Sequence, residues 1–340
     1  MSNSRIITGD CREVLASMPD RSVQCCITSP PYFGLRDYGI DGQIGLEQTP
    51  EAFVAEMVGV FREVRRVLRD DGTLWLNLGD SYCGPPRGNK NGWEGSGLAG
   101  VKSKKYQETL NAGTATTMDK SKLPGLKPKD LIGIPWRVAF ALQADGWYLR
   151  QDIIWHKPNP MPESVTDRCT KAHEYVFLLS KSERYHFDAE AIKEEAKTPP
   201  GESWEERKKA GATRGNVAFG ENVGAGTQRG VHGKGVSHNL GSPDGKKNKR
   251  SVWTVNTKPF KGAHFATFPT ELVLPCVLAG CPAGGSVLDP FNGAGTTGLV
   301  ALSNGRNYVG VELNPEYVEI TRQRLGLLAQ TVALEEHIHA

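Results

Sequence analysis

Two stretches of this 340-residue chain carry residue types that could do chemistry, and the first is rich in glycine. Residues 286–298 read SVLDPFNGAGTTG, an apolar run followed by a glycine turn. A strand, a glycine turn and a helix in that order let the backbone approach a ligand, and the helix N-terminus adds N–H donors. Glu312 ends the next apolar run, in YVGVELNP, where a carboxylate can accept both hydroxyls of a ribose. The pattern therefore predicts a nucleotide site.

The same glycines also fit the fingerprint of a dinucleotide-binding dehydrogenase. Gly293, Gly295 and Gly298 satisfy GxGxxG, which is a weak signal when taken alone. A dinucleotide fold needs several further strand–helix units after its fingerprint, and only 42 residues follow Gly298. The rest of the sheet must come from the N-terminal half, which disfavours this alternative.

The second stretch is Thr28-Ser29-Pro30-Pro31-Tyr32, directly after the buried run VQCCIT. Two prolines fix this loop at the carboxyl edge of the predicted sheet, where doubly wound folds place ligands. A ring-conjugated amino group is a poor nucleophile, so an enzyme that methylates one must accept hydrogen bonds from its N–H groups and position it. The Ser29 hydroxyl and the Pro30 carbonyl are the predicted acceptors, and Tyr32 can stack on a base that has left its duplex.

Together the two stretches resemble the motifs of the DNA amino-methyltransferases. TSPPY resembles their (D/N/S)PP(Y/F) motif, and DPFNGAGTT resembles their S-adenosylmethionine (AdoMet) motif. The resemblance covers Ile7 to about Ala329 apart from two loops, and the motif order is that of the beta group. It implies methyl transfer from AdoMet to cytosine N4 or adenine N6 in duplex DNA. Serine at position 29 is most frequent in the cytosine enzymes, but serine forms with adenine specificity exist.

The resemblance also implies roles for individual residues. The predicted catalytic residues are Ser29, Pro30, Pro31 and Tyr32. The predicted cofactor residues are Asp10, Cys11, Phe268, Pro269, Thr270, Glu271, Asp289, Pro290, Phe291, Gly293, Gly295, Thr296, Thr297, Glu312 and Asn314. The predicted residues of the target-base pocket and DNA surface are Trp155, Lys157, Asn159 and Pro160. Asp10 has a second interpretation, as a cap of the helix over residues 11–18.

Alternating strands and helices must position these residues. Strands are expected near Val23–Thr28, Thr73–Leu78, Leu149–Trp155, Ser286–Asp289 and Tyr308–Glu312. Helices are expected near Glu51–Leu68, Leu131–Ala144, Pro269–Gly280, Gly295–Ser303 and Pro315–Leu325, and the first of these is expected to stop at Gly72 in a left-handed conformation. The alternation predicts an α/β fold, a Rossmann-like AdoMet-dependent methyltransferase fold with a mostly parallel sheet, helices on both faces and a circularly permuted motif order.

Two irregular stretches interrupt this pattern. Residues 84–129 are polar, glycine-rich and lysine-rich, and are expected to form a mobile basic loop. Between Arg207 and Lys261 stand twelve Lys or Arg against two acids, so we expect residues 192–261 to be a target-recognition insertion that contacts DNA. The predicted organisation is a catalytic half (1–191), this insertion, and an AdoMet-binding half (262–340).

Composition narrows the functional classes. No apolar run is long enough for a membrane span, and the start MSNSRIITGD lacks the apolar core of a signal peptide, so a cytoplasmic protein without a membrane partner is expected. Seven cysteines without a CxxC pair predict reduced, buried thiols, and no metal is expected. His156 and His173 are expected to have ordinary structural roles, because no other residues with metal-ligand spacing accompany them.

Two alternatives stay open beside a DNA methyltransferase. One is a catalytically silent DNA-binding protein of the same fold, which the intact TSPPY and AdoMet motifs disfavour. The other is an amino-methyltransferase acting on RNA or protein, which the basic insertion disfavours. By analogy with the family, a homodimer and a partner restriction endonuclease are also expected.

Overall fold

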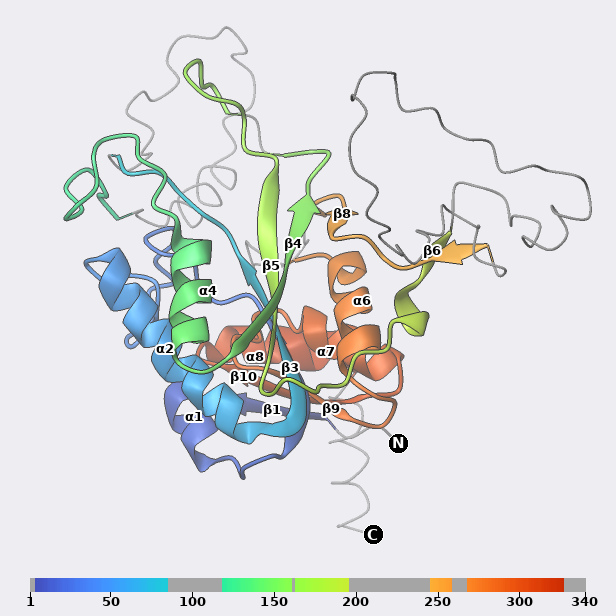
Figure 1. The fold of residues 1–340 in the computed structure, drawn as a ribbon. Coiled ribbons are helices and arrows are strands. Elements are labelled where there is room, and N and C mark those ends of the chain that lie inside the picture. The colour runs from blue at the N-terminus through green and yellow to red at the C-terminus, as the bar shows by residue number, and fades with distance from the viewer. Residues whose placement is uncertain (1–3, 85–117, 161–162, 196–244, 259–267, 327–340) are drawn as a thin grey trace, which may run out of the picture. The chain divides into compact units, whose positions relative to one another are not determined.

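The structure, a computed structural model, describes residues 4–84, 118–160, 163–195, 245–258 and 268–326, and it divides into two units. The larger unit comprises the chain up to Asp188 and from Arg250 onward, and the smaller unit comprises Ala189–Lys249 (Figure 1). The strands of the larger unit are β1 (Ser4–Thr8), β2 (Val23–Thr28), β3 (Leu68–Leu78), β4 (Tyr148–His156), β5 (His173–Ser180), β8 (Val252–Thr254), β9 (Ser286–Asp289) and β10 (Asn307–Glu312). Its helices are α1 (Cys11–Ser17), α2 (Pro50–Val67), α4 (Ile134–Ala144), α6 (Thr270–Gly280), α7 (Thr296–Ser303) and α8 (Pro315–Arg324). The smaller unit holds η1 (Glu190–Ile192) and the antiparallel pair β6 (Glu194–Glu195) and β7 (Lys246–Lys247).

The strands of the larger unit form one sheet in the order β1-β10-β9-β2-β3-β5-β4-β8. Neighbouring strands pair in parallel except at β5, which is antiparallel to both β3 and β4. The mostly parallel sheet that the sequence predicts is therefore confirmed. β9 from the C-terminal part of the chain pairs directly with β2 from the N-terminal part, so the two predicted halves share a single sheet.

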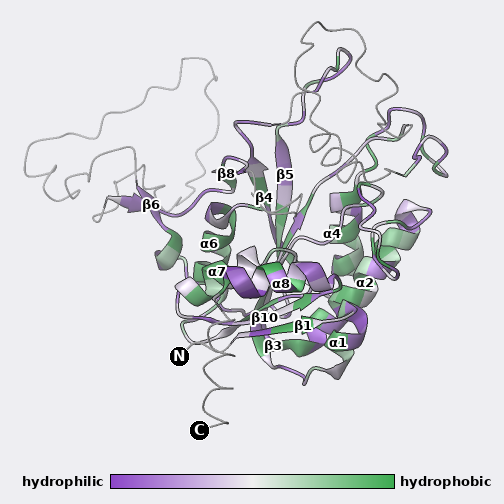
Figure 2. Cartoon of the chain, turned by 180° about the vertical axis from the view of Figure 1, so that it is seen from behind, coloured by the Kyte–Doolittle hydropathy of each residue, from purple (hydrophilic) through white to green (hydrophobic). Residues whose placement is uncertain are grey.

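Helices cover both faces of this sheet, because its central strands are apolar on both sides. Cys26 belongs to the core that α2 and α4 form with the sheet, whereas Cys25 faces Gly280 at the end of α6. Adjacent strand residues point to opposite faces, so the two neighbouring cysteines serve two cores. Gly280 allows a close approach, since a Cβ there would lie 2.3 Å from Trp75 Nε1. Figure 2 shows hydrophobic strands between these helices, with α8 mostly hydrophilic on the outside.

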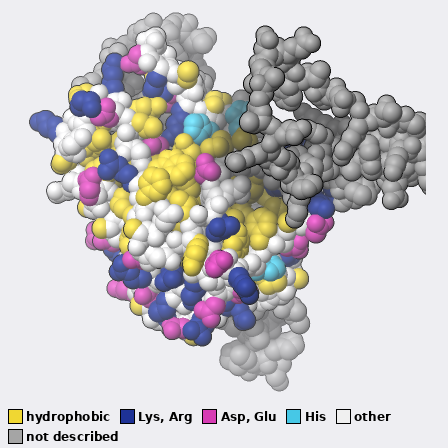
Figure 3. All heavy atoms as spheres, in the orientation of Figure 1, with side chains coloured by type: hydrophobic (Ala, Val, Ile, Leu, Met, Phe, Trp, Pro, Cys, Tyr) yellow, Lys and Arg dark blue, Asp and Glu magenta, His cyan; other side chains and the backbone are white. Residues whose placement is uncertain are grey.

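Side chains on the surface are mixed. Hydrophobic groups gather over α4 and β4, where Phe140 and Tyr148 are exposed, and over α6, while charged groups cover α1 and α2 (Figure 3). All seven cysteines are free thiols, and only Cys169 is exposed. Within the described ranges, no helix combines the length and the apolar character needed to cross a membrane.

The end of α2 differs from the prediction. The helix ends at Val67, and β3 begins at once with Leu68, so Gly72 lies inside a strand and not in a left-handed helix cap. Leu68 is fully buried and pairs with Val23, after which the register shifts and Thr73 pairs with Cys25. Burial of Leu68 in the sheet therefore decides where the helix stops.

The predicted basic loop is in part packed against the core. Residues 85–117 lie outside the described residues, but the end of the stretch, from Met118 to Lys129, is ordered on the larger unit. Leu123 is buried, and the buried Lys120 donates from Nζ to the Phe33 carbonyl oxygen at 3.1 Å and to Ser81 Oγ at 3.0 Å. An apolar anchor and a satisfied ammonium thus tie residues 118–129 to the segment after TSPPY.

The C-terminal boundary predicted for the insertion also changes. Most of residues 192–261 lie outside the described residues, but β8 pairs in parallel with β4, and Trp253 is buried against Trp75. Residues 250–258 therefore belong to the larger unit, although their composition is polar. A role for the remaining insertion in reading DNA stays a prediction.

Candidate active site

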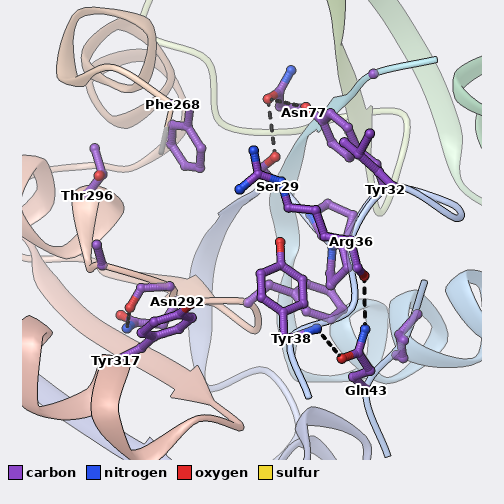
Figure 4. A pocket seen from close by; sticks show the side chains of 18 of the residues that line it. Ser29, Tyr32, Arg36, Tyr38, Gln43, Asn77, Phe268, Asn292, Thr296 and Tyr317 are labelled. Atoms are coloured by element: carbon purple, nitrogen blue, oxygen red, sulfur yellow. Dashed lines mark hydrogen bonds between the residues drawn. The ribbon is translucent and has the colours of Figure 1, made fainter. Parts of the chain in front are cut away.

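A cavity of about 650 Å³ opens at the carboxyl ends of the parallel strands, where the sheet changes its direction of winding. From β9 the chain continues to β10 on one side, and from β2 it continues to β3 on the other. Such a switch point leaves a crevice for ligands in open α/β sheets. The cavity is lined from the ends of β1, β2, β3, β9 and β10, and Figure 4 shows Phe268 and Thr296 on the side away from Tyr32 and Asn77.

The glycine turn after β9 forms one wall of the cavity. Gly293 lines it with a φ of 53°, and its N–H donates to Glu312 Oε2 at 2.7 Å. The N–H of Asn314 donates to the other oxygen, Glu312 Oε1, at 2.9 Å. Burial raises the pKa of Glu312 to about 7 although both amide bonds act in the opposite direction. One carboxylate therefore holds the turn and faces the cavity.

Asp289 lies behind this wall and does not line the cavity, unlike its neighbours Pro290 and Phe291. Its Oδ1 accepts from Thr28 Oγ1 at 2.6 Å and its Oδ2 accepts from Thr297 Oγ1 at 2.7 Å. The buried carboxyl thus connects β9 to β2 and α7, and burial raises its pKa to about 6. Asp289 and Thr297, both predicted as cofactor residues, do not line the cavity and instead hold the strand and helix ends beside it.

The start of α6 contributes one side chain to the cavity, that of Phe268. Pro269 is buried at the cap position, and Glu271 points outward into an ion pair with Lys258. Thr270 donates to Glu271. Among the four residues predicted here, only Phe268 borders the cavity. Gly295 also stays outside it, because it begins α7 against Thr321.

Asp10 is a helix cap, and its predicted cofactor role stays a prediction. Its carboxylate caps α1 by accepting from the N–H of Arg12 at 2.8 Å, and it also lines the cavity together with Cys11. The side-chain hydrogen bond from Arg12 lowers the pKa of Asp10, whereas burial raises the pKa of the Cys11 thiol to about 12. Cys11 is therefore a neutral wall residue.

The opposite wall carries a hydrogen-bonded group around Ser29. The Ser29 hydroxyl donates to Asn77 Oδ1 at 3.2 Å, and the Tyr32 hydroxyl donates to Glu174 Oε2 at 2.9 Å while also lying 3.2 Å from Asn77 Oδ1. Asn77 Nδ2 donates to the Tyr175 carbonyl at 3.0 Å, so the amide oxygen is the atom that faces Ser29. The serine hydrogen is thus occupied, and its lone pairs are left to accept.

The residues around Ser29 and the glycine turn both lie within the part of the chain that a protein-family model matches. The sequence model described as DNA methylase matches residues 23–323, which include both walls of the cavity. The chain belongs to the DNA methylase family. The methylase is an AdoMet-dependent DNA methyltransferase that acts on an exocyclic amino group, N6 of adenine or N4 of cytosine.

Individual relatives agree with the family. The Type II methyltransferase M.Cfr9I of Citrobacter freundii is 47% identical over 325 residues, covering 96% of this chain and 88% of that protein. The Type II methyltransferase M.SmaI of Serratia marcescens is 43% identical over 325 residues, covering 96% and 91%. The solved PvuII DNA methyltransferase, described as cytosine-N4-specific, has a TM-score of 0.58 at 18% identity over 94% of this chain and 86% of that chain. A DNA modification methylase from Thermus thermophilus, solved with S-adenosyl-L-methionine, has a TM-score of 0.52 at 23% identity over 95% and 94%. These two likenesses show the shared fold.

The cofactor side of the methylase fits AdoMet. Each Glu312 oxygen accepts one amide and keeps a lone pair for a ribose hydroxyl, and the carboxylate borders the cavity. Phe268, Phe291 and Tyr317 add aromatic surface next to it. Thr296 receives a hydrogen bond from Arg324, which fixes its side chain at the N-terminus of α7.

The pocket predicted for the target base lies next to Tyr32. Trp155, Lys157 and Pro160 line the cavity, and Lys157 Nζ stands 4.1 Å from the centre of the Trp155 ring. Asn159 does not line it, because its side chain is used in a pair of hydrogen bonds with the backbone of Thr257. Asn159 therefore joins two segments of the chain and does not line the cavity.

The sequence analysis missed several cavity residues of the methylase. Asn77 and Glu174 lie at the ends of β3 and β5, and only the strand order brings them to Ser29. Arg36 and Tyr38 come from the loop after TSPPY, which Gln43 braces through the Tyr38 N–H and the Arg36 carbonyl (Figure 4). His173, assigned an ordinary structural role, also lines the cavity. The available signal was a tyrosine, an arginine and four glycines between TSPPY and the next helix.

Proposed function

We propose that the cavity methylates the N4 amino group of a cytosine drawn out of duplex DNA. The observation that carries this proposal is the hydrogen bond from Ser29 to Asn77. Because the serine hydrogen is directed at Asn77, the serine oxygen can accept a hydrogen bond from a substrate N–H. The Pro30 carbonyl, at the same cavity wall, is a second acceptor for the other N–H.

Two acceptors hold the amino group in the orientation that the reaction needs. Hydrogen bonds to both N–H groups increase electron density on the nitrogen and direct its lone pair toward the cofactor side of the cavity. When bound, AdoMet supplies an electrophilic methyl group on a positively charged sulfur. The nitrogen–carbon bond forms as the carbon–sulfur bond breaks, and one amino proton then leaves to water.

The aromatic walls support a base that is extruded from the duplex. The Tyr32 ring lines the cavity, and Trp155 lines it on the side of β4. An unstacked base regains stacking energy on an aromatic ring, on the order of 1–3 kcal/mol per base. A base that remained in the helix could not present its amino group to a site at the bottom of this cavity.

Position 29 supports cytosine over adenine. A hydroxyl is a weaker acceptor than the carboxylate that is usual in the adenine enzymes, and serine is most frequent in the cytosine enzymes. We also propose that the insertion at residues 192–261 is the surface that recognises the DNA sequence. The homodimer, the partner endonuclease and a cytoplasmic site of action stay predictions from the resemblance.

The test is to express the methylase in a host without DNA methylation and to digest the genomic DNA to nucleosides. Mass spectrometry is expected to find N4-methylcytosine above the level of an empty-vector control. N6-methyladenine in its place would keep the amino-methyltransferase and overturn the choice of base. If neither modified nucleoside is found and labelled methyl groups appear on RNA or protein instead, DNA is not the substrate.

A further inference from the structure

Glu174 connects Tyr32 to Lys157 in the pocket predicted for the target base. It lies on β5 and borders the cavity with a side chain that is only 16% exposed. One carboxylate oxygen accepts from the Tyr32 hydroxyl at 2.9 Å, and the other pairs with Lys157. Lys157 in turn lies over the Trp155 ring. A single carboxylate therefore connects the aromatic residue on the TSPPY loop to the aromatic residue on β4.

The Tyr32 ring contacts the backbone of Gly79, in addition to the hydrogen bond from its hydroxyl to Glu174. A Cβ on Gly79 would lie 2.5 Å from Tyr32 Cε2, so the ring packs directly on the backbone of residue 79. The contact with Gly79 and the hydrogen bond to Glu174 together restrict the position of the ring. Since Tyr32 also borders the cavity, a stacked base would take its position from these two contacts.

The same group orients Ser29. Tyr32 and Ser29 both lie at hydrogen-bond distance from Asn77 Oδ1, and Asn77 Nδ2 is 3.5 Å from Glu174 Oε2. Because Asn77 is an amide, it accepts the Ser29 hydrogen but offers no route by which a proton could pass on to Glu174. Through Asn77, Glu174 can therefore hold the geometry of Ser29.

We propose that Glu174 is a positioning residue for methyl transfer, which seats Tyr32 against the target base and, through Asn77, keeps the Ser29 lone pairs directed at the amino group. This inference rests on the proposed function of the cavity. The role is conveyed through the Tyr32 hydroxyl, so the loss of Glu174 and the loss of that hydroxyl should have overlapping effects.

The test compares four variants with the wild-type protein: Glu174→Gln, Glu174→Ala, Tyr32→Phe, and Glu174→Ala combined with Tyr32→Phe. Transfer of labelled methyl from AdoMet to unmethylated genomic DNA is measured in a single turnover with both substrates saturating. Glu174→Ala is expected to lower the rate about a hundredfold, because small misplacements of reacting groups cost about that much. Glu174→Gln, which keeps an oxygen for Tyr32, should recover about tenfold of this loss, and AdoMet affinity should stay within about twofold.

Glu51→Gln is the matched control, because it also removes a carboxylate paired with a cation, Arg137, but far from the cavity lining. Its rate should equal that of the wild type. In the Tyr32→Phe background, Glu174→Ala should add less than in the wild type. Fully multiplicative effects, or a wild-type rate for Glu174→Ala, would overturn the inference.

A second measurement separates this inference from the proposed function. Crystal structures of the wild type and of Glu174→Ala show directly whether the Tyr32 ring and the Ser29 hydroxyl move, whatever the substrate is. An unmoved Tyr32 ring contradicts the positioning role even if DNA is methylated. A wild-type protein that methylates no DNA contradicts the proposed function, while a displaced ring in the variant still supports the role of Glu174.

Discussion

At position 29 the methylase carries a hydroxyl, and the orientation of that hydroxyl decides what it can do. Alone, serine both donates and accepts. Here Asn77 takes the hydrogen, and Asn77 is itself held by the Tyr175 backbone, so Ser29 presents only acceptor capacity to the cavity. On the opposite wall Glu312 is similarly defined by its partners, two backbone amides that stabilise the buried carboxylate.

Ser29→Ala is expected to lower the single-turnover rate of methyl transfer by about a hundredfold, which is the scale for removing one preorganised polar contact to a reacting group. AdoMet affinity should be nearly unchanged, because Ser29 is bonded to Asn77 on the wall opposite Glu312 and is not among the predicted cofactor residues. Rapid-quench measurement of the rate and calorimetric titration of AdoMet check the two parts. A rate equal to that of the wild type would remove Ser29 from the catalytic assignment.

AdoMet affinity is expected to depend on pH through Glu312. Its pKa is raised from 4.5 to about 7 in the unliganded protein, so the carboxyl is increasingly protonated below pH 7 and loses acceptor capacity for ribose hydroxyls. The affinity should therefore fall about tenfold from pH 8 to pH 6. Glu312→Gln is the control, and it should bind AdoMet weakly with a smaller pH dependence. An equal slope in both proteins would assign the titration to another group.

At the scale of elements, the site depends on strand ends that a buried carboxyl group holds together. Asp289 joins β9 to β2 and α7 through two threonine hydroxyls, and its Oδ1 also accepts from the Phe291 N–H at 3.1 Å. The strands that carry Ser29 and the glycine turn are thus linked by one buried carboxyl. This arrangement explains why an acidic residue stands at a position that does not face the ligand.

Asp289→Ala should destabilise the protein by about 3 kcal/mol, because three buried donors lose their acceptor. Chemical denaturation measures this, and AdoMet binding should weaken as well because Phe291 shifts. Asp289→Asn is the gentler variant. The pKa of Asp289 is raised from 3.8 to about 6, so its stabilising contribution is present below pH 3.8 and is lost as pH rises through 6. Asparagine does not titrate, so the stability of the Asp289→Asn variant should not fall over this pH range. Equal stability of the alanine variant and the wild type would contradict the linking role.

At the scale of the larger unit, the cavity joins parts of the chain that are far apart in sequence. β9 and β10 bring the cofactor wall, and β2 and β3 bring the wall with Ser29, within one continuous sheet. A ligand that contacts both walls therefore stabilises both parts of the chain together. The permuted order of the motifs has no effect on the geometry of the sheet.

AdoMet at a hundred times its dissociation constant is expected to stabilise the folded protein by about 2.7 kcal/mol. For a domain of this size, that corresponds to a rise in melting temperature of roughly 4–5 °C. The larger unit should shift as one transition in differential scanning calorimetry. Two transitions, of which only one shifts, would contradict a cofactor site shared by both walls.

The sequence by itself determined the elements and the two motifs. Strands Val23–Thr28 and Ser286–Asp289 are confirmed as predicted, because continuous apolar runs bounded by prolines or glycines leave little choice of conformation. Ser29, Pro30, Pro31 and Tyr32 border the same cavity as Gly293, because the carboxyl ends of parallel strands meet at one edge. Local patterns of this kind do not depend on distant parts of the chain.

The tertiary structure alone decided which strands are neighbours and which polar groups meet. Asn77 and Glu174 lie 97 residues apart in sequence and contact each other only because β3 pairs antiparallel with β5. Pairing and burial likewise explain why Asp289, Asn159 and Glu271 do not line the cavity, although Thr257 and Lys258, the partners of Asn159 and Glu271, do. The same reason explains why Leu68 and Trp253 belong to the sheet. A polar residue in a sequence shows what it can bind, but its partner is set by pairing and burial, which involve residues that are not adjacent in the chain.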